Sequence, residues 1–297
     1  MKSEARLLRL KLDIDCPLNL DFTLCCGQTF RWDKQGEWWY GVVKGRACKL
    51  RQVENTLEGV NVESGFIKEY LGLDDDLPKI FAQINKDENM DSAIKAFSGL
   101  KILRQEPWEC LISYICATYK NILAIKRMLH ELSKKFGNKT VFEERNFYTF
   151  PTAKKLANAS IDDLAKCGLG YRAKYVSETA KMIHRAGFDF ECLKRLPYDE
   201  AKRELLHFPG VGLKVADCVL LFSLGKTEAF PVDVWVKRVI MRCYTEHFPK
   251  EFAEKISGKK SLTDVEYAKL SKFGRDYFGK YAGYAQEYLY HYERTKT

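Results

Sequence analysis

Residues 207–218 read H-F-P-G-V-G-L-K-V-A-D-C, and this stretch decides the fold. Apolar residues at helical spacing predict one helix before it, over 198–206, and a second over 215–224 that stops at Gly225. The segment between the two helices is rich in glycine, which adopts tight turns and lets another molecule approach the backbone closely. The pattern predicts a helix-hairpin-helix unit.

Four residues make the predicted hairpin: Pro209, Gly210, Val211 and Gly212. The Val211 side chain can plug between the two helices. The backbone amides of 210–214 would lie at the opening of the second helix, where unpaired N–H donors and the positive end of the helix dipole attract a phosphate. This arrangement favours a sequence-independent grip on a nucleic-acid backbone. The alternative is a glycine-containing turn between two core helices.

Two residues near the hairpin carry candidate chemistry. Lys214 falls in the first turn of the second helix, where the dipole disfavours a cation and favours the neutral, nucleophilic amine. Asp233 follows nineteen residues later, in P-V-D-V (231–234), and is well placed to cap a helix over 234–244. A carboxylate held there would stay ionised and could face a developing cation. Capping alone is the structural alternative.

A phosphate grip, an amine and a carboxylate together suit cleavage of an N-glycosidic bond. Attack at C1′ of a nucleotide builds positive charge on the sugar, which Asp233 could stabilise. Lys214 could capture C1′ as a covalent adduct that becomes a Schiff base, and strand nicking by β-elimination can follow. Because a base inside a duplex is out of reach, the nucleotide must flip into a pocket.

The composition fits a nucleic-acid partner. The 297 residues carry a net charge of +9, which suits a polyanion, and the length allows two or three domains. No apolar run is long enough to span a membrane, so we expect no membrane partner. Ten cysteines without C-x-x-C indicate a reducing compartment: the cytoplasm, with the protein on nucleoid DNA, or the nucleus in a eukaryote. The histidine and cysteine spacings predict no metal site.

The periodicity changes along the chain and predicts an α+β protein. Residues 15–32 are expected to be irregular, residues 250–262 to form a loop, and residues 265–292 to form one or two helices. We predict an N-terminal antiparallel β domain with short helices over 1–97, a helical domain carrying the hairpin over 98–224, and C-terminal helices over 225–297 that complete the second helical domain and the base pocket.

Six collinear segments cover most of the chain and carry a family resemblance: G-Q-T-F-R-W (27–32), L-R-Q-E-P-W-E-C-L-I-S-Y-I-C (103–116), G-L-G-Y-R-A-K-Y-V (168–176), P-G-V-G-L-K-V-A-D-C (209–218), P-V-D-V (231–234) and Y-A-G-Y-A-Q (281–286). With them the chain resembles the helix-hairpin-helix DNA glycosylases, and specifically the 8-oxoguanine DNA glycosylases of the bacterial and eukaryotic type. The hairpin lysine and P-V-D mark the superfamily. The N-terminal β region, G-Q-T-F-R-W and the Cys218–Gln286 pair mark the 8-oxoguanine branch.

The resemblance implies a bifunctional glycosylase and AP lyase of base excision repair, acting on 8-oxoguanine and also on formamidopyrimidine in duplex DNA. It implies Lys214 as the nucleophile and Asp233 as the essential carboxylate. The Gly27 carbonyl would accept a hydrogen bond from N7–H of the lesion, where guanine itself has an acceptor. The remaining base-binding residues are Gln286 at the pairing edge, Cys218 and Tyr290 on the two ring faces, and Pro231. Tyrosine at 290 replaces the usual phenylalanine and keeps a stacking face.

The resemblance also implies contacts with the DNA around the lesion. Tyr171 would wedge beside the lesion and Arg172 would contact the unpaired base, although a helix cap followed by an exposed face also explains them. The other implied DNA-binding residues are Tyr119, Asn121, Gly210, Val211, Gly212 and Trp235.

Some positions depart from the family. Tyr119 and Lys120 stand where the eukaryotic type has asparagines, and only Asn121 is retained. Ala124 occupies the position of an arginine that reads the opposite cytosine, and Trp235 replaces a histidine near the phosphate. We therefore predict weaker selectivity for cytosine opposite the lesion.

Two other functions stay open at this point. A non-catalytic helix-hairpin-helix DNA-binding protein would need neither Lys214 nor Asp233. A glycosylase of the same fold for another damaged purine would not need the Gly27–Gln286 pair. We expect no cofactor beyond a monovalent cation that the resemblance allows on the hairpin carbonyls. We expect a monomer, because the nucleic acid is already a large partner.

Overall fold

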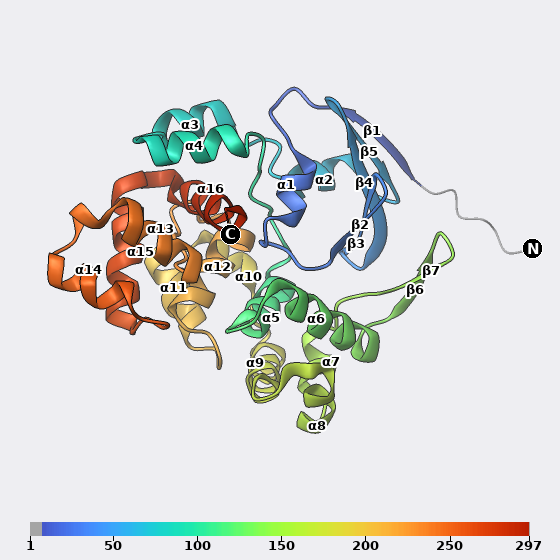
Figure 1. The fold of residues 1–297 in the computed structure, drawn as a ribbon. Coiled ribbons are helices and arrows are strands. Elements are labelled where there is room, and N and C mark those ends of the chain that lie inside the picture. The colour runs from blue at the N-terminus through green and yellow to red at the C-terminus, as the bar shows by residue number, and fades with distance from the viewer. Residues whose placement is uncertain (1–7, 297) are drawn as a thin grey trace, which may run out of the picture.

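The computed structural model describes residues 8–296 and has an antiparallel sheet on one side of a larger helical body (Figure 1). The sheet has the strand order β1-β5-β4-β3-β2. Its strands are β1 (Arg9–Asp13), β2 (Trp32–Gln35), β3 (Trp38–Val43), β4 (Arg46–Val53) and β5 (Thr56–Val60). Helix α2 (Ser64–Tyr70) follows the sheet, and Trp32 Nε1 donates to the Tyr70 hydroxyl at 2.9 Å inside the shared core. The predicted α+β class is confirmed.

The prediction that residues 15–32 are irregular is wrong in part. They contain helix α1 (Leu20–Cys25). The Asn19 side chain caps it by accepting from Phe22 N at 2.9 Å. Leu20 and Leu24 are buried in the core of the sheet domain, so tertiary packing stabilises a helix that is too short to persist alone.

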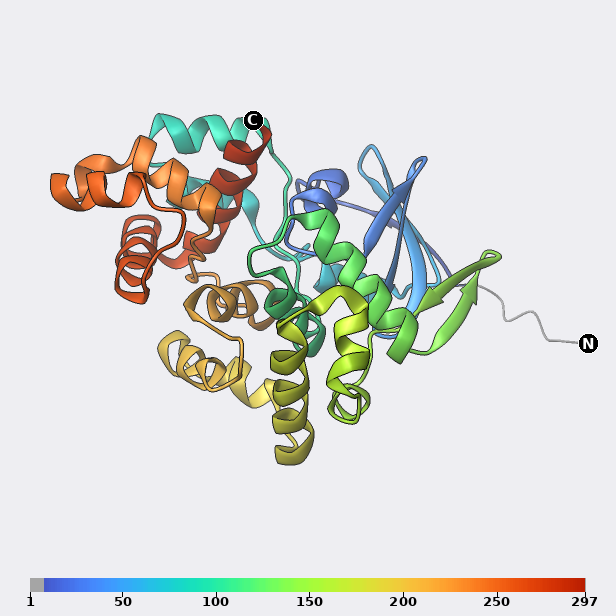
Figure 2. The ribbon, with the colours of Figure 1, turned by 60° about the horizontal axis from the view of Figure 1, so that its bottom comes forward.

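The helical body is built from short and medium helices, which Figure 2 shows from a second direction. They are α3 (Leu77–Ile84), α4 (Glu88–Ala96), α5 (Pro107–Ala117), α6 (Ile122–Phe136), α7 (Ala153–Ala157), α8 (Ile161–Leu164), η1 (Ala165–Leu169), α9 (Arg172–Ala186), α10 (Phe190–Arg195), α11 (Tyr198–Leu206), α12 (Leu213–Leu224), α13 (Val234–Cys243), η2 (Thr245–His247), α14 (Lys250–Ser257), α15 (Asp264–Phe278), η3 (Gly279–Tyr281) and α16 (Ala282–Thr295). The prediction of a loop over 250–262 is wrong, because α14 occupies most of it and buries Ala253 and Ile256.

A hairpin of β6 (Lys139–Phe142) and β7 (Arg145–Tyr148) interrupts the helices and was not predicted. It lies against the N-terminal sheet, where Glu143 pairs with Lys49 at 2.7 Å. The turn residues Glu143 and Glu144 both have positive φ, 47° and 62°. Asparagine and glycine usually supply that conformation, so the two glutamates gave no turn signal.

The two cores do not follow the chain order strictly. Apolar residues of α3 and α4, which precede residue 97, belong to the core of the helical body. The Phe81 ring meets the Tyr288 ring of α16 edge-on at 5.5 Å, and the Tyr288 hydroxyl donates to the Leu100 carbonyl at 2.9 Å. Figure 1 shows α3 and α4 beside α16. The boundaries at residues 97 and 224 stay a prediction.

Within residues 8–296, no helix combines the length and the apolar composition that crossing a membrane requires.

Candidate active site

The predicted hairpin joins α11 to α12, and both helices lie within one residue or two of their predicted limits. Val211 is 7% exposed and belongs to the main core, and its place between the two helices stays a prediction. Gly210 has φ 81°, and a Cβ there would lie 2.8 Å from the Tyr175 side chain. A Cβ on Gly212 would meet no protein atom within 4 Å. The turn therefore needs glycine at 210 for its own packing and leaves open space at Gly212.

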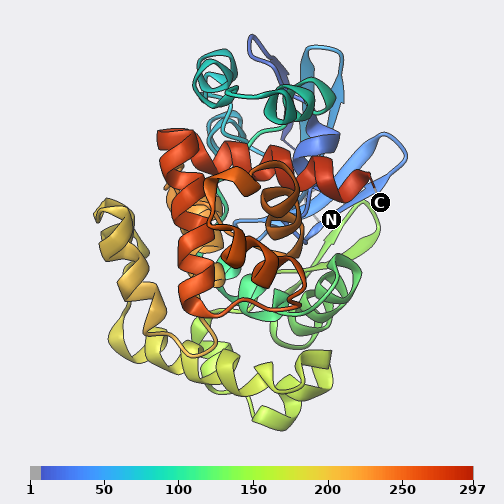
Figure 3. The same cartoon turned by 60° about the vertical axis from the view of Figure 1, so that its left-hand side comes forward.

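A cavity of about 450 Å³ opens beside this hairpin. Its lining residues come from the end of α1, from α5, α6 and α12, from the start of α13 and from α16. Figure 3 shows α16 crossing the front of the molecule. Nine predicted site residues line it: Gly27, Asn121, Lys214, Cys218, Pro231, Asp233, Trp235, Gln286 and Tyr290. Segments as far apart in the chain as Gly27 and Arg294 thus form one pocket.

Lys214 lies half-buried in the first turn of α12. Its Nζ is 6.0 Å from the centre of the Tyr114 ring, and it makes no hydrogen bond or ion pair with any residue that the structure describes. Its charge interacts with Asp233 and with Cys218 across the cavity. An amine without a bound partner is free to turn toward a substrate.

Asp233 caps α13, as predicted: its Oδ1 accepts from the amides of Trp235 and Val236, both at 2.9 Å. Burial raises the pKa of Asp233 above the usual value, although Lys214 and the two amides act in the opposite direction. Burial thus opposes the expected ionisation. An ionised Asp233 depends on the nearby Lys214 and on its cap bonds.

The walls of the cavity present flat, apolar faces. Tyr114 stacks on Phe222 with centroids 5.7 Å apart and a 13° interplanar angle, and Phe30 meets Tyr114 edge-on at 5.7 Å. Cys218 is 3% exposed, and burial raises the pKa of its thiol to about 12, so the sulfur stays protonated and uncharged at neutral pH. Such walls can sandwich a planar base.

Gly27 and Tyr290 meet at one side of the cavity. Gly27 has φ 109°, and a Cβ there would lie 3.1 Å from both the Tyr290 hydroxyl and Ile122 Cδ1. Any side chain at 27 would therefore strain the backbone and fill the pocket. The tyrosine at 290 also places a hydroxyl beside Gly27 that a phenylalanine would lack.

Two adjacent residues of α16 have buried polar atoms that a ligand could satisfy. Gln286 is 4% exposed and Glu287 is 2% exposed, and the Oε1 atom of each is buried with no hydrogen-bond partner in the described chain. A buried polar atom without a partner costs free energy, so native proteins rarely keep one without a use. For Gln286, a flipped base would supply the partner that the resemblance implies.

The sequence analysis missed Glu287 and Arg294, which also line the cavity. Burial raises the pKa of Glu287 to about 7, and the nearby Asp233 adds to this, whereas the Cys26 thiol and Arg294 lower it. Both residues follow helical spacing from Gln286, but the same spacing fits a face packed in the core, so no local signal marks them as pocket residues.

Three predicted DNA contacts, Tyr119, Tyr171 and Arg172, do not line the cavity, whereas Asn121 does. Tyr119 and Tyr171 are 80% and 57% exposed. Asn121 uses its side chain to cap α6, accepting from Ala124 N at 2.8 Å. Arg172 is only 4% exposed, because its guanidinium donates to the Thr118 carbonyl and lies 4.4 Å from the centre of the Tyr171 ring. Its predicted contact with an unpaired base requires the side chain to leave that carbonyl.

Within residues 8–296, no three histidine, cysteine, aspartate or glutamate side chains are grouped so that they could hold a metal ion.

The fold and this cavity define a base-excising DNA repair protein. Residues 112–260 match the HhH-GPD superfamily of base excision DNA repair proteins, and residues 11–111 match the N-terminal domain of 8-oxoguanine DNA glycosylase. The chain belongs to the HhH-GPD superfamily and, through its N-terminal domain, to the 8-oxoguanine glycosylase branch.

Relatives and solved structures agree with this assignment. The chain is 31% identical to the N-glycosylase/DNA lyase OGG1 of Arabidopsis thaliana over 92% of its own length and 76% of that protein. It is 30% identical to a probable N-glycosylase/DNA lyase of Methanothermobacter thermautotrophicus over 70% of its own length and 68% of that protein. The Clostridium acetobutylicum 8-oxoguanine glycosylase/lyase bound to DNA with cytosine opposite the lesion superimposes with a TM-score of 0.85 at 30% identity, covering 97% of this chain and 98% of that one.

Proposed function

We propose that this enzyme excises 8-oxoguanine, and also formamidopyrimidine, from duplex DNA as a bifunctional N-glycosylase and AP lyase. The observation that carries the proposal is one cavity that brings Lys214 and Asp233 together with Gly27, Cys218 and Gln286. The named substrate of the Clostridium acetobutylicum enzyme supports the choice of base.

The reaction uses the two charged residues in sequence. As the N-glycosidic bond breaks, the base leaves with the bonding electrons and takes up a proton, and the ionised Asp233 stabilises the positive charge on the sugar. Lys214 gives its proton to the departing base, its neutral Nζ then forms a bond to C1′, and opening of the sugar ring gives a Schiff base. Loss of the C2′ proton then expels the 3′ phosphate and nicks the strand.

Recognition of the base uses the walls of the cavity. Cys218 and Tyr290 sandwich the ring, Pro231 lines the pocket beside it, and Gln286 bonds the pairing edge. The Gly27 carbonyl accepts from N7–H, which 8-oxoguanine has and guanine lacks. The orphaned Gln286 Oε1 supports this assignment, because a base would satisfy it.

The hairpin and the surrounding loops hold the DNA. Gly210, Val211 and Gly212 present backbone amides to a phosphate, and Tyr171 fills the space that the flipped nucleotide leaves. A monovalent cation on the carbonyls of 207–212 would reduce their repulsion of that phosphate, and no chemical step depends on it. The protein works on its DNA as a monomer, in the cytoplasm or, in a eukaryote, in the nucleus.

Borohydride trapping on a duplex that contains one 8-oxoguanine tests the proposal. We expect a covalent complex with the unaltered protein and none with Lys214→Gln, because glutamine cannot form the Schiff base. Lys120 also lines the cavity, so Lys120→Gln is the matched control and should still trap.

Three outcomes would contradict the proposal. Trapping that survives in Lys214→Gln but is lost in Lys120→Gln would show that Lys120, and not Lys214, is the nucleophile. Trapping on an alkylated purine alone would identify another glycosylase. Binding of the duplex with neither trapping nor base release would leave only a DNA-binding module.

A further inference from the structure

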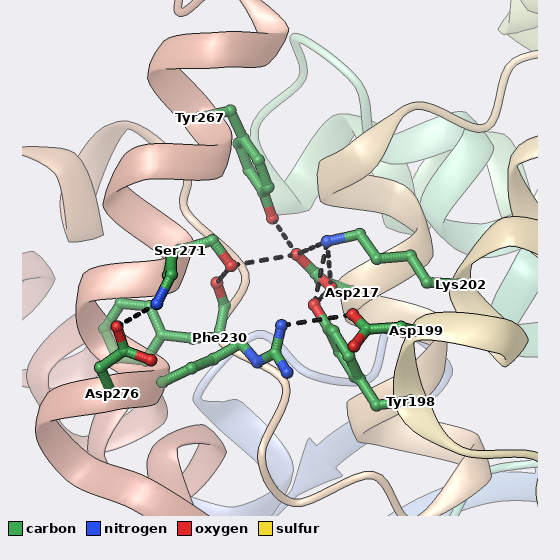
Figure 4. Close-up of polar contacts among 10 residues, drawn as sticks. Tyr198, Asp199, Lys202, Asp217, Phe230, Tyr267, Ser271 and Asp276 are labelled. Atoms are coloured by element: carbon green, nitrogen blue, oxygen red, sulfur yellow. Dashed lines mark hydrogen bonds and ion pairs between the residues drawn. The ribbon is translucent and has the colours of Figure 1, made fainter.

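Asp217 is a fully buried carboxylate on α12, three residues after Lys214. Its partners come from two other helices (Figure 4): the Tyr198 hydroxyl donates at 2.5 Å and Lys202 Nζ at 2.9 Å from α11, and the Tyr267 hydroxyl donates at 2.6 Å from α15. Replacing a buried ion pair by apolar residues is often neutral or stabilising, so stability alone does not explain this one.

The α15 partner of Asp217 also holds the segment that carries Asp233. The Tyr267 hydroxyl accepts from Val232 N at 3.3 Å, directly before Asp233. One turn further along α15, Ser271 Oγ donates to the Phe230 carbonyl at 2.9 Å and lies 3.4 Å from Asp217 Oδ2. Ser271 has a single proton, and the shorter distance assigns it to Phe230.

These bonds form a continuous connection between the two candidate catalytic residues. Lys214 and Asp217 share α12, Asp217 binds Tyr267, and Tyr267 binds the amide next to Asp233. No hydrogen bond or ion pair joins Lys214 to Asp233 directly among the described residues. Their separation is therefore fixed through the protein, and Asp217 lies in the middle of the path.

We propose that Asp217 is a positioning residue for the glycosylase reaction: through Tyr267 it sets the position of Asp233 relative to Lys214. The inference rests on the proposed function. The Tyr198 and Lys202 bonds attach α11, so the helices on both sides of the DNA-gripping hairpin are held in the same cluster. A misplacement of about 1 Å at a reacting group can slow a reaction about 100-fold, so a hydroxyl far from the substrate can matter for rate.

Two tyrosines give a matched pair of variants. Tyr267→Phe and Tyr198→Phe each remove one short phenol bond to Asp217, but only Tyr267 also binds the Asp233 segment. We expect Tyr267→Phe to lower the single-turnover rate of base release at least about tenfold. We expect Tyr198→Phe to retain that rate within about twofold, and both variants to bind a duplex with an abasic-site analogue as the unaltered protein does.

A pH profile separates positioning from loss of stability. Asp233 is faced by Lys214 and Cys218 on α12, by Glu287, Tyr290 and Arg294 on α16, and by the amides at the start of α13. A carboxylate that moves away from Lys214 binds its proton more tightly. The acid limb of the rate should therefore shift to higher pH in Tyr267→Phe and stay in place in Tyr198→Phe.

Equal rate losses in the two variants, or no loss in either, would overturn the proposal. If Tyr267→Phe does not fold, Asp217→Asn replaces it: the uncharged amide weakens the Tyr267 bond, and an unchanged rate there would also refute positioning. Failure of the proposed function is distinguishable, because the unaltered protein would then release no 8-oxoguanine.

Discussion

At the scale of the residue, the pocket contains the uncharged thiol of Cys218 and the amine of Lys214, which has no hydrogen-bond partner among the described residues. It also contains the carboxyl groups of Asp233 and Glu287, whose pKa values are raised by burial. Cys218 keeps its proton, with its pKa raised to about 12, while Asp233 depends on Lys214 and two amides to lose one. Lys214 and Asp233 were found from local sequence, because a helix start imposes a recognisable chemistry on the residues beside it. Glu287 was not, because only packing makes it a pocket residue.

Glu287 makes the stability of the folded protein depend on pH. Its pKa in the folded protein is raised to about 7 from an ordinary value of 4.5. The folded state therefore binds this proton more tightly than the unfolded state does. The free energy of unfolding that this binding contributes is fully present below pH 4.5 and is lost as the pH rises through 7. We expect Glu287→Gln to be more stable than the unaltered protein at pH 8, by on the order of 2 kcal/mol, and about equal at pH 5. Thermal unfolding at both pH values measures the difference.

The exposed Glu200 on α11 provides the control. Glu200→Gln should leave the difference between pH 5 and pH 8 as it is in the unaltered protein. A Glu287→Gln protein with the same pH dependence as the unaltered one would show that Glu287 ionises normally.

At the scale of the element, the hairpin is specified by two glycines with different tasks. Gly210 is required by its φ of 81° and by the Tyr175 ring, whereas Gly212 has open space beside it. Thr179 of α9 also donates to the Pro209 carbonyl at 3.0 Å, so a neighbouring helix supports the turn. The sequence predicted the turn, but only the structure separates the glycine that folds it from the one that faces solvent.

The open space at Gly212 predicts a variant that impairs binding alone. Gly212→Ala should keep the melting temperature, because its Cβ meets no protein atom within 4 Å. It should weaken binding to damaged and undamaged duplexes alike, by about tenfold or about 1.4 kcal/mol, because the methyl group keeps the phosphate away from the amides. Fluorescence anisotropy with both duplexes measures this.

Gly210→Ala is the comparison, since it should lower the melting temperature through contact with Tyr175. Unchanged affinity in Gly212→Ala would mean that no phosphate approaches the hairpin at this residue.

At the scale of the whole molecule, the surface beside the pocket combines distant segments. The loop at 118–121 follows α5, and Arg172 at the start of α9 reaches back to the Thr118 carbonyl. Ala124, in the first turn of α6, offers no polar side chain to an opposite base. Arg172 is therefore bound within the protein, and Ala124 has no group that could read that base.

This surface predicts weak discrimination among opposite bases. We expect base-release rates opposite cytosine, thymine, guanine and adenine to lie within about tenfold of one another. One good bidentate contact with the opposite base would contribute about 1–3 kcal/mol of discrimination, and this surface offers no such contact. Single-turnover rates on four duplexes that differ only at that base measure the ratios. Ala124→Arg should raise the preference for cytosine. A strong cytosine preference in the unaltered protein would refute the prediction and give Arg172 the reading role.

The sequence by itself determined the hairpin, the helices on either side of it, and the lysine and aspartate beside two helix starts. Each depends on residues within a few positions of one another, and periodicity, glycine and capping report such short-range preferences directly. The tertiary structure alone decided that α14 and the β6–β7 hairpin form, that Glu287 and Arg294 enter the pocket, and that Asp217 is held by Tyr198 and Tyr267. These features depend on burial and on contacts between residues far apart in the chain, which no local pattern encodes.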